Sequence, residues 1–126
     1  MSWTAQFRPG DVSYVELGYI GMLKAHDLQE ALAAGIKLGR EHDTWLVLAD
    51  CSRLDGGHTI VDLFGLAAAL AELGAAQRFR EALIAPVNPD VAETVKFWET
   101  TSLNRGLQVR MFPERDAAVE WLIASH

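Results

Sequence analysis

The chain has 126 residues, of which 50% are hydrophobic and 22% are charged. This composition is typical of one globular domain and excludes a disordered or fibrous chain, so we expect a single domain over residues 1–126. Its 11 basic and 17 acidic residues give a net charge of −6. Such a charge repels phosphate backbones and anionic lipids and argues against a nucleic-acid partner.

Cysteine usage and hydropathy predict the compartment. Cys51 is the single cysteine of the chain, so no internal disulfide can form. Residues 1–11 lack the basic start and apolar run of a signal peptide. The most apolar run, residues 63–71, is interrupted by Gly65 and is far shorter than the ~20 residues that a membrane span needs. We therefore expect a cytoplasmic protein without a transmembrane segment.

Hydrophobic periodicity and turn residues predict nine segments along the chain. Residues 8–11, with the sequence Arg-Pro-Gly-Asp, separate two strand-like runs and predict an N-terminal β-hairpin. Apolar residues at three-and-four spacing indicate a helix over 27–41, and the short apolar run 45–49 is typical of a strand covered on both faces. The later segments are helix 60–73, strand 79–85, helix 89–104, strand 107–112 and helix 114–124.

The predicted order is ββαβαβαβα, which indicates the α/β class. Strands joined by helical crossovers lie parallel in one sheet, because such crossovers are right-handed. We expect a single sheet of about five strands, mainly parallel after the N-terminal hairpin, with four helices packed on it. Asn88, Pro89 and Asp90 favour the start of the third helix through an asparagine cap, a proline in the first turn and an acid near the helix dipole.

Four stretches carry a family resemblance: VELGYIGMLKAHDLQEAL, WLVLADCSRLDG, VDLFGLAAAL and QVRMFPERDAAVEWL. In this order they resemble the STAS fold of anti-sigma factor antagonists. They are most similar to the SpoIIAA-like group of small bacterial proteins, which is related in fold to CRAL-TRIO lipid-binding domains. The resemblance covers nearly the whole chain and implies a small regulatory protein that binds a protein partner.

The resemblance also bears on phosphorylation. In phosphorylated members the acceptor serine lies in an Asp-Ser-Ser-Gly-Leu pattern, which matches residues 62–66 of this chain. Leu63 and Phe64 replace the two serines, so no phosphate can be accepted at the family's position. Thr59 and Ser52 carry hydroxyl groups nearby, but neither lies at the matched position.

Residues 48–66 contain the residue types of several reactive sites. Cys51 and His58, with Asp50 or Asp55, supply the groups of a thiol-based triad. We retain a Cys51-dependent enzyme only as a remote alternative, because strand ends commonly carry a small cysteine. The histidines show no pair at metal-ligand spacing, and Gly56-Gly57 has no following lysine or arginine to bind phosphate. We expect no metal and no cofactor.

The segment 60–73 is apolar around most of its circumference. Thr59 and Asp62 predict a capping box at its start. Its main stripe, from Ile60 to Ala71, is joined by a second apolar side that includes Leu66 and Leu73, and one sheet cannot cover both sides. Three interpretations remain open: packing among neighbouring helices, an interface with another chain, or a pocket for an apolar ligand.

We expect a non-enzymatic protein that binds a protein partner, or a second copy as a dimer, through the strand-to-helix edge 50–66. Asp50, Arg53, Asp55 and Asp62 would form its polar rim. The alternative is a carrier of a small apolar or lipid-like ligand under helix 60–73, with Phe64, Leu66 and Phe97 lining the cavity. The predicted partner-facing or ligand-facing residues are Asp50, Ser52, Arg53, Asp55, His58, Thr59, Asp62, Leu63, Phe64, Leu66, Leu73 and Phe97.

Overall fold

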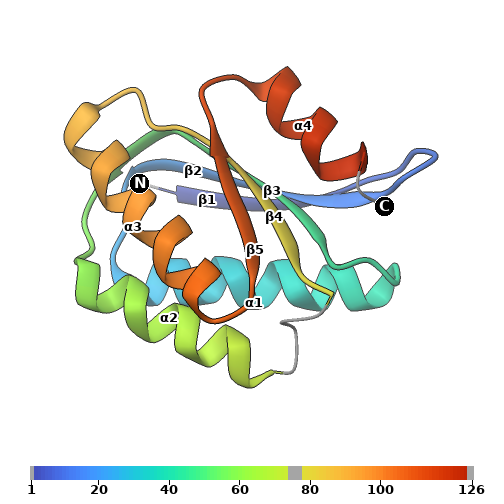
Figure 1. The fold of residues 1–126 in the computed structure, drawn as a ribbon, viewed down its shortest axis with the longest axis horizontal. Coiled ribbons are helices and arrows are strands. Elements are labelled where there is room, and N and C mark those ends of the chain that lie inside the picture. Colours follow the sequence, from blue (N-terminus) through green and yellow to red (C-terminus); the bar gives the residue numbers. More distant parts are fainter. Residues whose placement is uncertain (1, 74–77, 125–126) are drawn as a thin grey trace.

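A computed structural model describes residues 2–73 and 78–124, which form five strands and four helices in the predicted order (Figure 1). The strands are β1 (Ser2–Arg8), β2 (Tyr14–Met22), β3 (Leu46–Gly56), β4 (Arg80–Ile84) and β5 (Gln108–Phe112). The helices are α1 (Ala25–Glu41), α2 (Ile60–Glu72), α3 (Pro89–Asn104) and α4 (Arg115–Ala124). Within this part of the chain, no helix has the length and apolar character needed to cross a bilayer.

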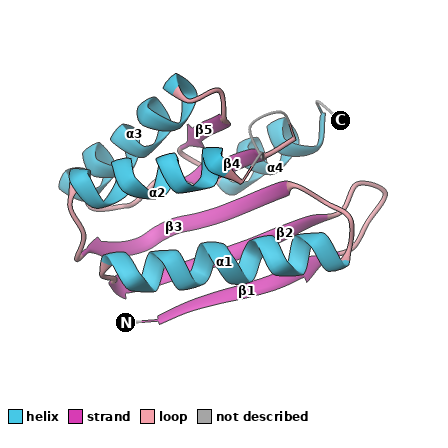
Figure 2. Ribbon diagram, turned by 90° about the horizontal axis from the view of Figure 1, so that it is seen from below, coloured by secondary structure: helices cyan, strands magenta, loops and turns pink. Residues whose placement is uncertain are grey.

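The strands form one sheet in the order β1-β2-β3-β4-β5. β1 and β2 pair antiparallel, and each later pair of neighbours is parallel. Helices α1, α2 and α3 cover one face of the sheet, while α4 covers the other (Figures 1 and 2). The predicted fold class, a mainly parallel α/β sheet that begins with a hairpin, is confirmed.

The alternation of side chains along the strands creates two cores of unequal size. On the face covered by three helices, Leu17 of β2 and Val47 of β3 join a large cluster that includes Phe79. On the opposite face, Leu48 of β3 packs with Leu122 of α4 in a smaller cluster. β3 and β4 are therefore buried on both faces, and for the run 45–49 of β3 this was predicted.

β3 is longer than predicted. The apolar run predicted a strand over 45–49, whereas the observed strand continues to Gly56. The extension forms because β2 reaches Met22 and pairs with the polar segment, with register shifts near Gly18 and Gly21. Such pairing between distant segments leaves no local hydrophobic signal in the sequence.

The helix starts follow the predicted chemistry. The Thr59 hydroxyl accepts the Asp62 N–H at 3.1 Å, and an Asp62 carboxylate oxygen accepts the Thr59 N–H at 2.8 Å. The predicted capping box is therefore present at the start of α2. The Asn88 side chain accepts the Asp90 N–H at 3.0 Å, which caps α3 as predicted.

α2 presents a different face to the protein than its apolar stripe suggested. It packs mainly against α3, less against α1, and does not lie flat on the sheet. This tilt buries Leu66, whereas Ile60 and Phe64, which the stripe placed inward, each remain 50% exposed. The solvent-facing side of α2 is consequently apolar.

Candidate functional site

One end of the molecule brings together the carboxyl ends of three parallel strands and the starts of three helices (Figure 1). The Leu23 N–H donates to the Gly56 carbonyl at 2.8 Å, which joins the ends of β2 and β3. The Val87 N–H donates to the Ser52 carbonyl at 3.2 Å, which attaches the β4–α3 loop to β3. We call the exposed side chains of residues 20–24, 53–64 and 87–93 the strand-end surface.

Several of the polar residues predicted to face a partner also have local structural roles. One carboxylate oxygen of Asp50 accepts the Ser52 N–H at 3.0 Å and the Ser52 hydroxyl at 2.6 Å. This pair lies where β3 carries an extra residue opposite β2, so Asp50 supplies the acceptor for a backbone group at the irregularity. Thr59 and Asp62 are occupied by the capping box.

Arg53 and Asp55 differ from these residues because both are exposed. Within residues 2–73 and 78–124, neither side chain has a hydrogen-bond or ion-pair partner. The chain turns after Asp55 at a position that only glycine can occupy. Gly57 has φ of +101°, and a Cβ there would lie 2.7 Å from the Leu23 nitrogen. Arg53 and Asp55 are therefore free to contact another molecule.

Exposed hydrophobic side chains concentrate on the strand-end surface. Val61 is 78% exposed and Val87 is 83% exposed. Six of the eight large hydrophobic residues that are exposed in the described ranges belong to this surface: Ile20, Met22, Ile60, Val61, Phe64 and Val87. The Arg105 guanidinium lies 4.7 Å from the centre of the Phe64 ring, while Leu73 lies at the other end of α2.

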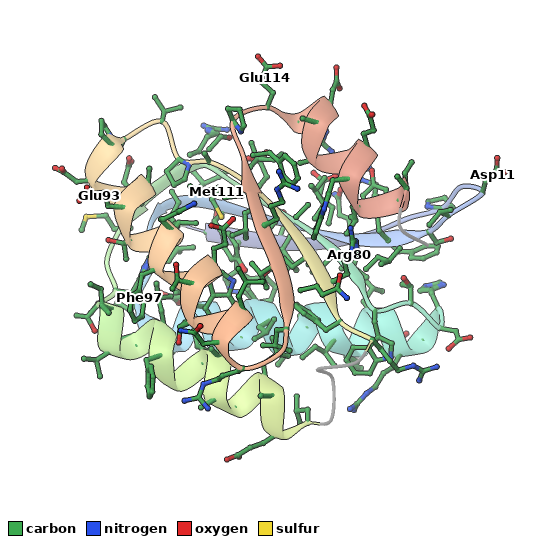
Figure 3. All side chains as sticks on the ribbon, viewed as in Figure 1. Asp11, Arg80, Glu93, Phe97, Met111 and Glu114 are labelled. Atoms are coloured by element: carbon green, nitrogen blue, oxygen red, sulfur yellow. The ribbon has the colours of Figure 1, made fainter. Side chains whose placement is uncertain are left out.

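The rim of this surface carries more carboxylates than basic groups. Each of the three helices has an aspartate in its first turn, and Asp55 lies on the strand end. Glu93 points outward from α3 at the same end (Figure 3). The exposed lysine and arginine among these residues are Lys24 and Arg53. The surface is therefore apolar with an acidic rim.

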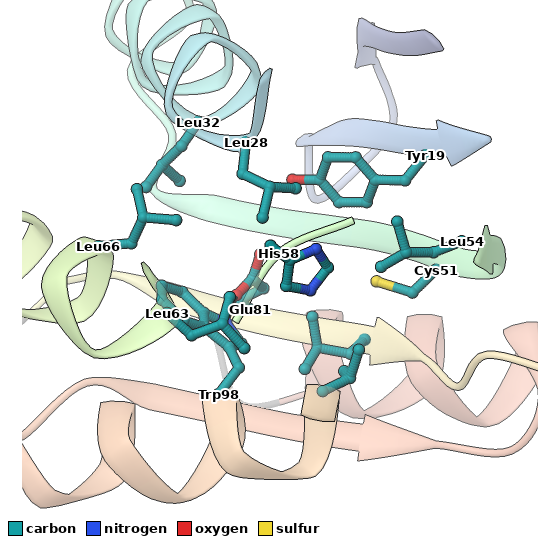
Figure 4. A pocket seen from close by; sticks show the side chains of 12 residues that line it. Tyr19, Leu28, Leu32, Cys51, Leu54, His58, Leu63, Leu66, Glu81 and Trp98 are labelled. Carbon is teal, nitrogen blue, oxygen red and sulfur yellow. Dashed lines mark hydrogen bonds between the residues drawn. The ribbon is translucent and has the colours of Figure 1, made fainter. Parts of the chain in front are cut away.

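A cavity of about 60 Å³ lies between the sheet and the three helices that cover it (Figure 4). Three of the predicted site residues, His58, Leu63 and Leu66, line this cavity. Phe64 and Phe97, which were expected to line it, do not. Phe97 is half-buried against the main core, and Phe64 faces solvent. The complete lining is Tyr19, Leu28, Leu32, Cys51, Leu54, His58, Leu63, Leu66, Glu81, Leu83, Val95 and Trp98.

The cavity contains ionisable groups that the sequence did not single out. Glu81 on β4 is only 3% exposed, and its carboxyl oxygen Oε1 accepts the Trp98 indole N–H at 2.8 Å. Burial raises the pKa of Glu81 to about 7, although the Trp98 hydrogen bond opposes the increase. Tyr19 on β2 is 8% exposed, and burial raises the pKa of its hydroxyl well above 10. An acid inside the predicted strand 79–85 was the signal available for Glu81.

Cys51 lies in the same cavity but lacks the features of a reactive thiol. Its side chain is buried, and burial together with the nearby carboxylates raises the pKa of the thiol well above 9. Thiol nucleophiles require a lowered pKa. His58 Nδ1 lies 3.2 Å from the Leu23 carbonyl and donates to it. Within the described residues, no group of three His, Cys, Asp or Glu side chains could hold a metal ion.

Comparisons with known proteins identify the fold. No model of a protein family matches the sequence, and no curated protein matches it. A solved structure of an uncharacterized protein from Shewanella loihica PV-4, of the DUF3478 family with a SpoIIAA-like fold, matches with a TM-score of 0.65 and 17% identity. The match covers 96% of this chain and 94% of that chain.

A second solved structure is the anti-sigma factor antagonist SpoIIAA in its unphosphorylated form. It matches with a TM-score of 0.57 and 15% identity, over 98% of this chain and 100% of that chain. Both matches extend over nearly the whole sheet and its helices, as the resemblance predicted. The chain therefore has a SpoIIAA-like α/β fold.

Proposed function

We propose that this protein is a non-enzymatic regulatory protein of the cytoplasm that binds a protein partner, or a second copy of itself as a dimer, through the strand-end surface. The observation that carries the proposal is the apolar, solvent-facing start of α2, where Val61 is 78% exposed and Phe64 is 50% exposed. Soluble proteins rarely leave large apolar patches open to water, and such patches with a polar rim mark interaction sites.

The chemistry of the surface indicates the kind of partner. Ile60, Val61 and Phe64 would supply the apolar centre, because the side chains of one helix face project together. The rim is acidic, and Arg53 and Asp55 are free of partners within the described residues. A partner with an apolar centre and basic rim residues fits this surface, because complementary charges favour the correct orientation.

The proposal is tested by comparing Val61→Glu with Leu103→Glu. Both residues are exposed hydrophobics on helices, but Leu103, which is 54% exposed, lies in the last turn of α3 and does not belong to the strand-end surface. Light scattering over a range of concentrations measures self-association. Capture of partners from a cell lysate by the immobilised protein, followed by mass spectrometry, measures binding to other proteins.

We expect Val61→Glu to lose the dimer or the captured partner, because a charge would be buried in the apolar centre. Leu103→Glu should behave as the wild type. Circular dichroism should show both variants folded, since both positions face solvent. Wild-type protein that is monomeric and captures the same proteins as Val61→Glu would contradict the proposal.

A second candidate function, a carrier of a small ligand, is favoured by the cavity. Its apolar lining and few polar groups are typical of ligand sites, although about 60 Å³ is too small for a lipid chain. Native mass spectrometry of the purified protein tests this candidate. A bound molecule of defined mass would support it, and the absence of any change at the cavity in NMR titrations with small alcohols would count against it.

A further inference from the structure

Two buried polar groups in the cavity have unused hydrogen-bonding capacity. Tyr19 comes from β2 and Glu81 from β4, and both are more than nine-tenths buried. Within the described residues, the indole of Trp98 is the hydrogen-bond partner of the Glu81 carboxyl, and it contacts Oε1. Oε2 of Glu81 and the Tyr19 hydroxyl have no hydrogen-bond partner in that part of the chain, and both residues line the cavity (Figure 4).

Both of these oxygen atoms border the cavity and are not enclosed by protein. Buried polar atoms are nearly always hydrogen-bonded, because an unpaired one loses its contacts with water without replacement. His58 adds a third polar group at the cavity. Its Nδ1 donates to the Leu23 carbonyl, so in the neutral ring Nε2 is an acceptor. The cavity therefore has polar groups directed at its space on one side.

The other walls of the cavity are apolar. Leu28 and Leu32 of α1 face Leu63 and Leu66 of α2 across the space. Leu32 and His58 are half-buried, whereas the remaining lining residues are buried, which places the opening between α1 and the start of α2. One water molecule needs about 10–15 Å³ of cavity volume. The cavity of about 60 Å³ therefore has room for roughly four to six non-hydrogen atoms.

We propose that this cavity binds a small neutral molecule with one hydroxyl group and a short aliphatic body, anchored by Glu81 and Tyr19. With the Glu81 carboxyl ionised at pH 8, a hydroxyl group can donate to Oε2 and accept from the Tyr19 hydroxyl, so it pairs with both groups. The aliphatic body lies among the leucines of α1 and α2. The inference rests on the carrier function proposed above and adds its polar anchor and the chemical class of the ligand.

The test uses 1-butanol and its isomer diethyl ether, which has the same atoms but no donor. Each is titrated at pH 8, where the Glu81 carboxyl is ionised, into ¹⁵N-labelled protein, and the amide shifts of residues around the cavity are followed by NMR. We expect 1-butanol to bind in the millimolar range, as befits so small a ligand, and diethyl ether to bind more weakly. Tyr19→Phe removes one hydroxyl and should weaken butanol binding about fivefold.

Tyr14→Phe is the matched control, because it makes the same change on β2 but packs on the face covered by α4. It should bind 1-butanol as the wild type does. Glu81→Met, which has a side chain of similar length, is the second variant and should also weaken binding, provided that circular dichroism shows it folded.

The outcomes separate the two proposals. Equal binding of both isomers, unchanged by Tyr19→Phe and Glu81→Met, would overturn the polar anchor and leave the carrier function standing. Absence of any shift near the cavity, at alcohol concentrations where the protein stays folded, would overturn both. Binding that prefers the alcohol and weakens in both variants would establish the anchor.

Discussion

Glu81 makes the stability of the protein depend on pH in the neutral range. In the folded protein the pKa of this carboxyl is about 7, compared with 4.5 for an ordinary glutamate. The unfolded chain therefore releases this proton near pH 4.5, while the folded chain holds it until about pH 7. Between these values the folded state binds one more proton, so stability falls as the pH rises.

The magnitude follows from the two pKa values. They differ by about 2.5, and each pH unit corresponds to about 1.4 kcal/mol, so Glu81 removes about 3 kcal/mol of folding stability by pH 8 relative to pH 4.5. The loss is complete a little above pH 7. Glu81→Gln keeps an oxygen for the Trp98 indole but cannot ionise, so this variant should lack the dependence.

Urea denaturation at pH 5, 6, 7 and 8 measures the effect. The free energy of unfolding of the wild type should decrease relative to that of Glu81→Gln at each step up to about pH 7. Glu99→Gln is the control, because Glu99 is also buried but is bound to the Met111 N–H and to Lys96. A wild type that keeps a constant difference from Glu81→Gln over the whole range would refute the reasoning.

Three further predictions follow from local geometry. The buried thiol of Cys51 should not react with a disulfide reagent at pH 7 until urea unfolds the protein, which absorbance measures; rapid reaction of the folded protein would contradict its burial. Gly65→Ala should raise the melting temperature, because alanine stabilises a helix interior by about 0.5–1 kcal/mol relative to glycine and a Cβ at this position meets nothing within 4 Å. Gly39→Ala should lower the melting temperature, because its Cβ would lie 2.5 Å from the Thr44 carbonyl oxygen. Thr59→Ala should reduce the free energy of unfolding by about 1 kcal/mol, because the Thr59 hydroxyl caps α2; urea titrations measure this change. An unchanged free energy of unfolding would contradict the role of the Thr59 hydroxyl and show that Asp62 alone caps the helix.

The fold could be predicted from the sequence because most of its elements carry local signals. The apolar spacing of residues 27–41 and the cap at Asn88 depend on neighbouring residues alone, and the structure confirms both. The end of β3 could not be predicted in this way. Residues 50–56 alternate poorly in hydrophobicity, and they become a strand because β2 extends alongside them with two register shifts.

The candidate interaction surface could be predicted only in part. The composition of α2 indicated apolar residues on more sides of the helix than one sheet can cover. The exposed side chains of Val61 and Phe64 agree with this prediction. Which residues would face solvent could not be read from the stripe, because α2 leans on α3. That choice depends on the sizes of side chains on another helix, which periodicity within α2 does not contain.

Glu81 shows why the polar side of the cavity was missed. Residues 80–84 have the sequence Arg-Glu-Ala-Leu-Ile, so the predicted strand 79–85 carries two adjacent charged residues, which point to opposite faces of the sheet. The Arg80 guanidinium lies 3.6 Å from the centre of the Trp121 ring, on the face covered by α4. Glu81 points to the opposite face, between Phe79 and Leu83, where three helices cover the sheet and its side chain lines the cavity. A carboxyl held there costs stability at neutral pH, and such costs concentrate where a protein uses the group.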